Sequence, residues 1–310
     1  MDGIFFLFLA FVTSILSIKL SKFGDILSKQ SKIGSMFIGG LLIASITSLP
    51  EFVTCISASI IDNPTLSLGD ILGSNFFNVF ALAVFNIVFF KKFFLKNIKP
   101  KYIFECLILL VSYFFVFLAC KNIGMFLSST LLIVCYVIYM ISLFFGEEVQ
   151  EKITLEKDKY IILKFFLTGL FMIILSILLT LEADKISRMY PSFSSSTIGA
   201  ILLGVTTSLP EVVTTFELIR LNNFNMAISN ILGSNIFNFL VLATSDFIFR
   251  GGYIYSYVDK YSFSYLYGGM IVLTLLMLTI TKSNKKNIFY TVCSLLIILI
   301  YFVVWYLQFA

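Results

Sequence analysis

Long apolar segments constrain this chain more than any other feature of its sequence. Six of them lie at residues 1–18, 102–120, 125–145, 161–181, 265–281 and 288–307. Each is long enough, or nearly so, to cross a bilayer core of roughly 30 Å as a helix, and none alternates as a barrel strand does. Apolar residues make up 59% of the chain and charged residues 13%, about half the charge of a typical soluble domain. We therefore expect an all-α integral membrane protein.

The basic residues predict how the chain crosses the membrane. With the more polar segments included, ten transmembrane helices are predicted, at roughly 3–18, 33–61, 67–89, 102–120, 124–145, 160–181, 197–219, 226–249, 265–281 and 287–308. Connections on one side of these spans carry 17 of the 22 Lys and Arg residues, and connections on the other side carry five. Because basic loops stay in the cytoplasm, both termini are expected outside it. The first segment is expected to be a span rather than a signal peptide, since no basic stretch precedes it and no small-residue cleavage site follows.

The chain contains an internal repeat at a constant offset of 160 residues. Residues 37–83 align without a gap onto 197–243, with 20 identities over 47 positions. Two motifs dominate the match: T-S-L-P-E at 47–51 and 207–211, and I-L-G-S-N at 71–75 and 231–235. Shared lipid-facing composition would explain matched Leu and Ile, but not matched Pro, Glu, Gly and Asn.

The two copies are predicted to face opposite ways. The first begins in the second predicted span and the second in the seventh, an odd number of crossings later. Inverted repeats of this kind give many secondary transporters two mirror-related routes to one site at the bilayer midplane. We therefore predict two inverted five-helix repeats, at residues 1–146 and 160–310, joined by a short cytoplasmic linker at 147–159.

Each copy places an acid inside an apolar span. Glu51 and Glu211 lie near the middle of their spans, where an ionised side chain costs a few kcal/mol and usually faces a cavity or a bound ion. No basic residue in either span lies near its glutamate to neutralise it. The proline before each glutamate is expected to kink the helix, over 46–50 and 206–210, because it removes a backbone donor. The kinks free carbonyl oxygens within reach of the carboxylates.

Other polar residues share helix faces with these acids. Residues three or four apart lie on one face, which groups Ser48 with Glu51, Ser208 with Glu211, Ser74 with Asn78, and Ser234 with Asn238. These groups are hard oxygen donors without thiolate or imidazole, and the chain has no histidine. Such a set suits calcium, which takes roughly 6–8 oxygen ligands, and also sodium. Two carboxylates balance one divalent ion or are shared among monovalent ions, which is a physical basis for antiport.

The two motifs resemble the paired alpha repeats of the calcium/cation antiporter superfamily, most closely the prokaryotic sodium/calcium exchangers. The resemblance extends over the ten-span layout. It implies exchange of Ca²⁺ for Na⁺ by alternating access, in which spans one and six slide against a rigid core. It also implies a transporter rather than an enzyme, with the ions as substrates, no cofactor, no nucleic acid and no obligatory protein partner. The expected location is the plasma (inner) membrane of a prokaryote.

The resemblance also assigns roles to individual residues. Glu51 and Glu211 would be central ligands shared by calcium and sodium. Thr47 and Thr207 would add backbone carbonyls to the calcium site, and Asn78 and Asn238 would complete its centre. Flanking sodium sites would be lined by Ser48, Ser74, Ser208 and Ser234 and by the carbonyls of Ala44 and Gly204.

The sequence departs from the family pattern at several positions. Ile46 and Thr206 stand where relatives often have glycine, so the kinks must form without it. Asn238 stands where several relatives carry aspartate, which argues against potassium co-transport and leaves a central charge of two. Asp70 stands opposite Asn230, and it is either a solvated acid at a loop end or a third carboxylate on the external access route.

Three other functions remain open from the sequence. A calcium/proton exchanger, or one for another divalent cation, would use the same two glutamates as proton acceptors. A passive cation channel would conduct without a counter-ion, but it gives no reason for mirrored helix-breaking motifs. The remote alternative is an intramembrane aspartyl protease built on Asp70, which needs a second facing aspartate, and the later candidate is Asp246.

Overall fold

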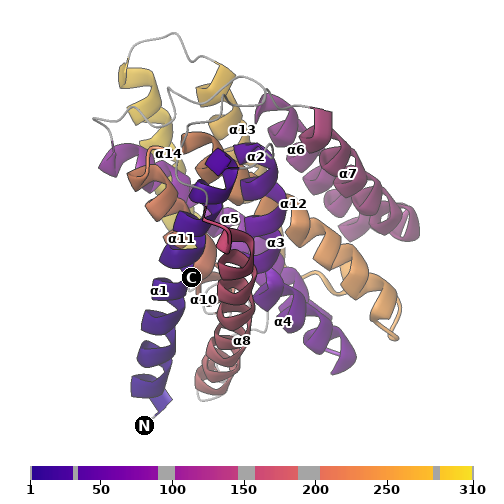
Figure 1. The fold of residues 1–310 in the computed structure, drawn as a ribbon. Helices are drawn as coiled ribbons and strands as arrows, with labels where there is room; N and C mark the ends of the chain where they lie inside the picture. Colours follow the sequence, from indigo (N-terminus) through magenta and orange to yellow (C-terminus); the bar gives the residue numbers. More distant parts are fainter. Residues whose placement is uncertain are drawn as a thin grey trace.

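The described residues form a bundle of helices. The computed structural model describes residues 2–30, 34–89, 102–145, 158–187, 203–281 and 287–308. Within these ranges the regular structure is entirely helical, so the predicted all-α fold class is confirmed. The elements (Figure 1) are α1 (Asp2–Gln30), α2 (Ser35–Phe37), η1 (Ile38–Ile43), α3 (Ala44–Thr47), α4 (Leu49–Ile60), α5 (Pro64–Val88), α6 (Tyr102–Cys120), α7 (Met125–Phe145), α8 (Ile161–Ser187), α10 (Gly204–Thr207), α11 (Leu209–Arg220), α12 (Phe224–Ile248), η5 (Ile254–Tyr257), α13 (Lys260–Thr281) and α14 (Asn287–Tyr306).

The described helices account for most of the predicted membrane crossings. Eight of them are long and apolar enough to span a bilayer, by length and composition. The segments Ser35–Thr47 and Leu49–Ile60, bent by 44° at their junction, make a ninth crossing if they are one span. The predicted span at 197–219 begins outside the described residues, and its remainder forms α10 and α11. The number ten therefore stays a prediction.

Helix α1 is longer than the predicted first span. It was expected to end near residue 18, but it continues to Gln30. The extension is amphipathic: Leu20 and Leu27 are buried, and the basic side chain of Lys29 pairs with Asp25 at 2.7 Å. A basic segment that looks like a loop on hydropathy alone thus forms a helix, because one of its faces packs on the protein.

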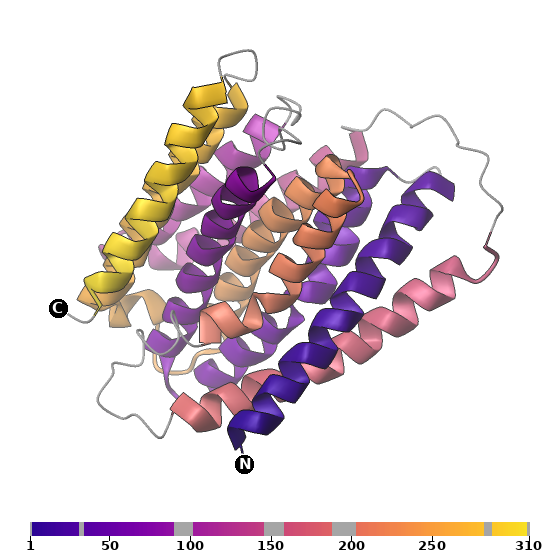
Figure 2. The same ribbon diagram turned by 90° about the vertical axis from the view of Figure 1, so that its left-hand side faces the viewer.

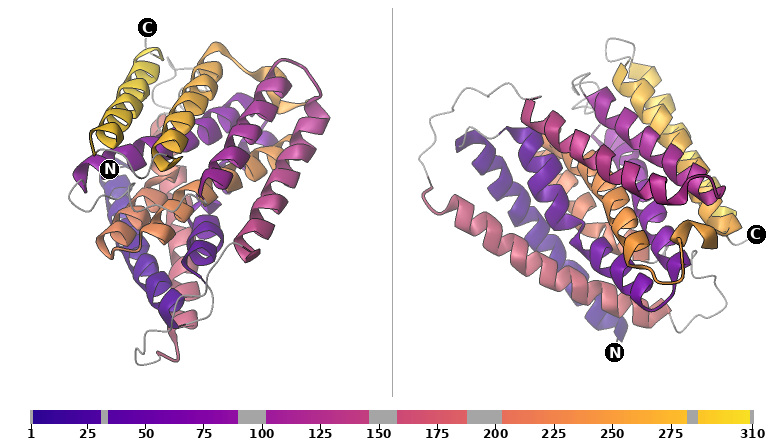
Figure 3. Two further views of the ribbon diagram at one scale, coloured as in Figure 1. Left: turned by 90° about the horizontal axis from the view of Figure 1, so that it is seen from above. Right: turned by 90° about the vertical axis from the view of Figure 1, so that its right-hand side faces the viewer.

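Helices α5 and α12 form the centre of the bundle. Of the most apolar window of each helix, 72% is buried in α5 and 89% in α12, but only 28% in α1, α8 and α14. Figure 2 shows α1 and α8 side by side on one flank, with α13 and α14 on the opposite flank. Figure 3 shows α6 and α7 packed beside each other. Polar groups near the middle of α5 and α12 are therefore shielded from lipid by the surrounding helices.

Helix boundaries repeat with the offset seen in the sequence. Helices α4 and α11, and likewise α5 and α12, begin and end 160 residues apart. The turns between them contain Asp62 (φ 57°) and Asn222 (φ 59°), also 160 residues apart. Asp and Asn are among the residues that most readily adopt a left-handed conformation. Both halves therefore reverse the chain direction after the T-S-L-P-E helix with a residue that tolerates a left-handed conformation.

A close backbone approach brings η1 against α12. A Cβ atom on Gly233 would lie 2.3 Å from the carbonyl oxygen of Gly40, closer than nonbonded atoms come. The hydroxyl of Tyr139 donates to the same Gly40 oxygen at 3.0 Å. Glycine at 233 is needed because a side chain would push η1 away from the centre, and η1 leads through α3 into the first T-S-L-P-E motif.

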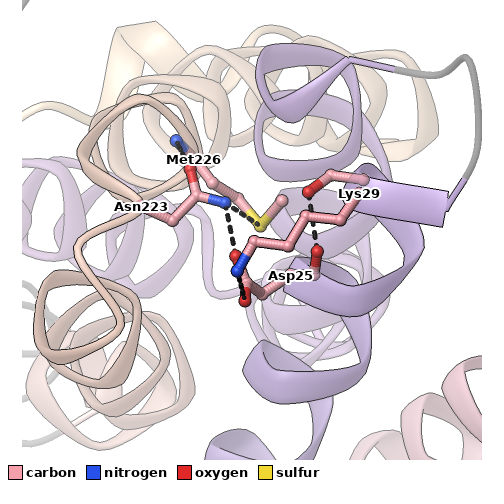
Figure 4. A network of polar contacts seen from close by, with 5 residues as sticks. Asp25, Lys29, Asn223 and Met226 are labelled. Carbon is pink, nitrogen blue, oxygen red and sulfur yellow. Dashed lines mark hydrogen bonds and ion pairs between the residues drawn. The ribbon is translucent and has the colours of Figure 1, made fainter. Parts of the chain in front are cut away.

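A polar network ties the extension of α1 to the start of α12 (Figure 4). The Asn223 amide donates to the Asp25 carboxylate at 2.9 Å, and its oxygen accepts the backbone N–H of Met226 at 3.2 Å. Asn223 is thus both the N-cap of α12 and the anchor for α1. The contact sets the position of the outer helix α1 relative to the central helix.

Candidate cation site

Each predicted acid lies in the first turn of a helix that follows a break. Ser48 separates α3 from α4, and Ser208 separates α10 from α11. A proline stands in the first turn of each second helix, beside Glu51 or Glu211. The helix is therefore broken at the predicted place in both copies, and in the first copy it bends there by 44°. The start of a helix carries partial positive charge, which stabilises a carboxylate there.

The serines at the breaks bond across the two halves. The Ser-x-x-Glu pattern of each motif typically forms a local capping box, but neither Ser48 nor Ser208 caps its own helix. Instead the Ser48 hydroxyl donates to Glu211 Oε1 at 2.7 Å, and the Ser208 hydroxyl donates to Glu51 Oε1 at 3.3 Å. The glutamates from the two repeats are thus brought together, each held by the serine of the other repeat.

The second oxygen of each carboxylate is free. Glu51 and Glu211 are both 0% exposed, and the Oε2 atom of each has no hydrogen-bond partner among the described residues. None of the ion pairs in the described part of the chain includes either acid. An uncompensated buried carboxylate costs several kcal/mol or more, so each must gain a cation or a proton. The two Oε2 atoms are therefore candidate ligands for a cation.

Four asparagines link α5 to α12 beside the acids. The Asn75 amide donates to the backbone oxygen of Asn235 at 3.2 Å, and the Asn235 amide donates to the backbone oxygen of Asn75 at 3.1 Å. The Asn78 amide donates to Asn235 Oδ1 at 2.9 Å, and the Asn238 amide donates to Asn75 Oδ1 at 3.0 Å. Every contact recurs when the two halves are exchanged.

This network determines which way the outer amides point. Backbone oxygens only accept, so Asn75 and Asn235 must turn their NH₂ groups toward them and their Oδ1 atoms away. Those Oδ1 atoms in turn require NH₂ groups from Asn78 and Asn238. The Oδ1 atoms of Asn78 and Asn238 are left buried with no described partner, as are the two carboxylate oxygens. The two glutamates and these two asparagines therefore present four unpartnered oxygens, two from each half.

Hydroxyl groups continue the polar core on the side of the second motif. The Ser74 hydroxyl donates to the Gly204 carbonyl at 3.1 Å and lies 3.4 Å from the Thr207 hydroxyl. Thr207 also donates to the carbonyl of Leu203 at 2.9 Å. The counterpart on the other side is formed by Thr47, which donates to the Ala44 carbonyl at 3.2 Å and lies 3.5 Å from the Ser234 hydroxyl.

The structure brings the predicted site residues into one buried region. Each of them is buried and bonds, directly or through a neighbour, to a residue of the other half; they are Ala44, Thr47, Ser48, Glu51, Ser74, Asn78, Gly204, Thr207, Ser208, Glu211, Ser234 and Asn238. Their roles as ligands stay predictions. Asn75 and Asn235 were not predicted, although both lie in the repeated I-L-G-S-N motif, which was the available signal.

Asp70 is not a solvated acid at a loop end. It lies inside α5, is 0% exposed, and accepts from the Cys55 thiol at 3.6 Å and from the Thr207 hydroxyl at 3.4 Å. Of the two alternatives that the sequence left open, the solvated one is therefore wrong. Asp246 is also buried, but it accepts from Ser129 at 2.6 Å and from the backbone N–H of Ile254 at 2.8 Å. Those bonds anchor η5, and neither involves Asp70.

A family profile matches both halves of the chain. The profile of the sodium/calcium exchanger protein family covers residues 3–145 and 160–310. Two relatives of comparable length are the inner membrane protein YrbG of Escherichia coli (strain K12) and the uncharacterized membrane protein MJ0091 of Methanocaldococcus jannaschii. The first is 25% identical over 273 residues, 81% of this chain and 80% of that protein. The second is 25% identical over 215 residues, 68% of this chain and 69% of that protein.

A solved structure shares the fold. The sodium–calcium exchanger NCX_Mj, soaked with 2.5 mM Na⁺ and 0.1 mM Ca²⁺, superposes with a TM-score of 0.70 at 20% identity, over 97% of this chain and 96% of that one.

Proposed function

The chain belongs to the sodium/calcium exchanger protein family, and on that premise we propose that it exchanges Ca²⁺ for Na⁺ across the membrane by alternating access. Membership in this family makes it an integral membrane antiporter, and its structural neighbours are transporters rather than enzymes. The transported ions are its substrates, and no cofactor or obligatory protein partner is part of the proposal.

One observation carries the proposal. Glu51 and Glu211, from different halves, are fully buried, are bonded by each other's serines, and each keep a free carboxylate oxygen. Two negative charges that have no basic partner in the described part of the chain match one divalent cation that has lost its water. The same charges are shared by monovalent cations when calcium leaves, so one ion type must occupy the site before the protein changes state.

The remaining oxygens complete the proposed site. The free Oδ1 atoms of Asn78 and Asn238, with backbone carbonyls at Thr47 and Thr207, would raise the oxygen count toward the roughly 6–8 that calcium takes. Flanking sodium sites would use the hydroxyls of Ser48, Ser74, Ser208 and Ser234 and the carbonyls of Ala44 and Gly204. Hard oxygen donors of this kind favour calcium and sodium over metals that prefer nitrogen or sulfur.

The outer helices are suited to carry the change of access. Helices α1 and α8 pack against each other, and only 28% of the apolar window of each is buried, compared with 72% and 89% in α5 and α12. We propose that this pair slides along a rigid core built on α5 and α12. Sliding apolar faces past one another breaks few hydrogen bonds; on α1 the bonds that would have to break or follow the motion include those of Ser21 to the Thr214 carbonyl and of Asn223 to Asp25.

The topology is part of the same proposal. Two inverted five-helix repeats, at residues 1–146 and 160–310, would be joined by the cytoplasmic linker at 147–159, most of which lies outside the described residues. Ten crossings then leave both termini outside the cytoplasm, in the inner membrane of a prokaryote. A protease-cleavable tag at the amino terminus would be cut in intact spheroplasts if this is right, and protected if the orientation is reversed.

Flux into proteoliposomes tests the exchanged ions. Vesicles loaded with sodium and diluted into sodium-free medium should accumulate radioactive calcium, and a protonophore should leave this uptake intact. The competing function, calcium/proton exchange by the same glutamates, predicts uptake that follows an imposed pH gradient and stops with the protonophore. Uptake without any counter-ion gradient would indicate a channel.

Variants test the site itself. Glu51→Gln and Glu211→Gln should each abolish exchange in protein that still elutes as a folded species, because one half of the balancing charge is gone. Asp158→Asn is the matched control, since Asp158 lies ahead of α8 and bonds to the exposed Lys164. Normal exchange by either glutamine variant would refute the site.

A further inference from the structure

The two halves of the site differ in charge at one buried pair of positions. Asp70 and Cys55 in the first half correspond, at the 160-residue offset, to Asn230 and Thr215 in the second. All four side chains are 0% exposed. The two copies of the repeat otherwise match closely around the glutamates. The buried acid Asp70 in one copy and the buried amide Asn230 in the other are therefore a chemical difference between two halves that have similar structures.

In the second half this pair is neutral: the Asn230 amide uses its N–H groups, and its Oδ1 atom is buried with no described partner. The Asn230 amide donates to the Thr215 hydroxyl at 2.9 Å and to the backbone oxygen of Glu211 at 3.2 Å. These bonds hold α12 to the first turns of α11, at the backbone of Glu211 and the side chain of Thr215. An amide here needs no counter-ion, so the second half is electrically complete without a ligand at this position.

In the first half the equivalent acid is poorly satisfied. Asp70 Oδ2 has the Cys55 thiol at 3.6 Å, and Oδ1 has the Thr207 hydroxyl at 3.4 Å. A thiol is a weak donor, and the Thr207 contact is long for a hydroxyl bond to a carboxylate, which normally measures about 2.5–2.7 Å. No ion pair among the described residues includes Asp70. The protein alone therefore does not compensate this buried charge.

Oxygen atoms surround the under-satisfied carboxylate. The Thr207 hydroxyl that faces Asp70 lies 3.4 Å from both the Ser74 hydroxyl and the Gly204 carbonyl. Ser74 is one helical turn after Asp70 on α5, so both project to the same side. Nearby, the Oε2 atom of the buried Glu51 also lacks a described partner. One carboxylate with a carbonyl and two hydroxyls is a set of hard oxygen donors of the kind that a small monovalent cation takes.

We propose that Asp70 is a cation ligand, which turns the pocket of Thr207, Ser74 and the Gly204 carbonyl into a charged binding site for a monovalent metal ion of the sodium class. This deepens the proposed function and rests on it. The mirror pocket of Thr47, Ser234 and the Ala44 carbonyl has no acid, so the two flanking pockets bind sodium unequally. The site then contains three carboxylates with a total charge of −3. One calcium ion together with one sodium ion would balance that charge.

The test replaces the charged pair by the neutral pair of the other half. Cys55→Thr with Asp70→Asn rebuilds in the first half the arrangement that Asn230 and Thr215 already form, which keeps the variant foldable. In proteoliposomes the sodium concentration for half-maximal calcium exchange should rise about tenfold, because a carboxylate ligand is replaced by a neutral one. The calcium concentration for half-maximal exchange should change much less.

Matched controls separate this effect from others. Asp62→Asn removes an acid from the exposed turn between α4 and α5, and should leave the sodium dependence unchanged. Cys55→Thr alone keeps Asp70 and should also behave like the parent protein. Lithium and potassium titrations of the parent and the double variant would report the size of ion that the pocket takes.

Three outcomes would overturn the proposal. A sodium dependence of the double variant within twofold of the parent would show that Asp70 binds no sodium. A change in the pH dependence alone would make Asp70 a proton site. Loss of all exchange by folded protein would place Asp70 in the shared central site. Failure of the proposed function would look different, because the parent protein itself would then show no sodium-driven calcium flux.

Discussion

The asparagine pair on α5 and α12 offers the sharpest test of how the site is built. Asn75→Ala removes one donor to the Asn235 backbone oxygen and one acceptor for the Asn238 amide. Both partners are buried and would be left without those bonds. The Asn235 oxygen lies inside α12 and keeps its intrahelical bond, so only the Asn238 amide is left unsatisfied. An unsatisfied buried polar group costs about 1–3 kcal/mol, which is the stability the variant should lose. Thermal unfolding in detergent should begin at a temperature several degrees lower than in the parent protein.

The same substitution has a second effect, on ion binding. Asn75 Oδ1 is what holds the Asn238 amide with its oxygen toward the site, so without it Asn238 can turn and present NH₂ to the ion. The stabilisation that calcium confers on the folded protein depends on its affinity. The shift of the melting temperature on adding calcium should therefore be smaller in Asn75→Ala than in the parent protein.

A control on the same helix isolates the second effect. Asn86 is also buried on α5, where it donates to Ser294 at 2.9 Å, and it lies outside the proposed site. Asn86→Ala should lower the melting temperature yet keep the full calcium-induced shift. If Asn75→Ala keeps that full shift as well, or melts with the parent protein, the orientation argument is wrong.

Other regions of the fold give further predictions. Gly233→Ala should lose about 1–3 kcal/mol and most transport, because its Cβ would meet the Gly40 carbonyl at 2.3 Å; a normal melting temperature would mean that η1 can retreat freely. Asn238→Asp should change the preference between sodium and calcium while expression persists, and an unaltered ion dependence would count against Asn238 lining the site. Asp25→Ala should unfasten the extension of α1 from the N-cap residue Asn223 and change the exchange rate, measured as initial calcium flux, more than the calcium affinity. Equal changes in both would argue for a purely structural contact.

Much of the fold follows from local sequence. Helices form wherever apolar segments of sufficient length occur, since lipid leaves backbone groups no other partners. The breaks at Ser48 and Ser208 follow from the prolines two residues later, which cannot donate to the preceding turn. Local sequence failed at α1, where a basic amphipathic segment was expected to be a loop and instead forms a helix to Gln30.

The residues of the site could be predicted from the sequence, but their hydrogen-bond partners could not. The repeated motifs identified both glutamates, and burial in an apolar span indicated that they bind something. The Ser-x-x-Glu pattern, however, suggests bonds within each motif, whereas Ser48 bonds to Glu211 and Ser208 to Glu51. The burial of Asp70 was also undecided, because a residue near the start of a helix is exposed or buried according to what packs on it.

By itself the sequence determined that the chain is a helical membrane protein with two related halves, each carrying an acid at a helix break. Those properties depend on hydropathy, proline and repetition, which act over a few residues at a time. Only the tertiary structure decided which oxygens stay free, because that depends on hydrogen bonds between residues about 160 positions apart in the sequence. The orientation of Asn78 and Asn238 and the unmet charge of Asp70 arise where the two halves meet, and no segment of either half contains them alone.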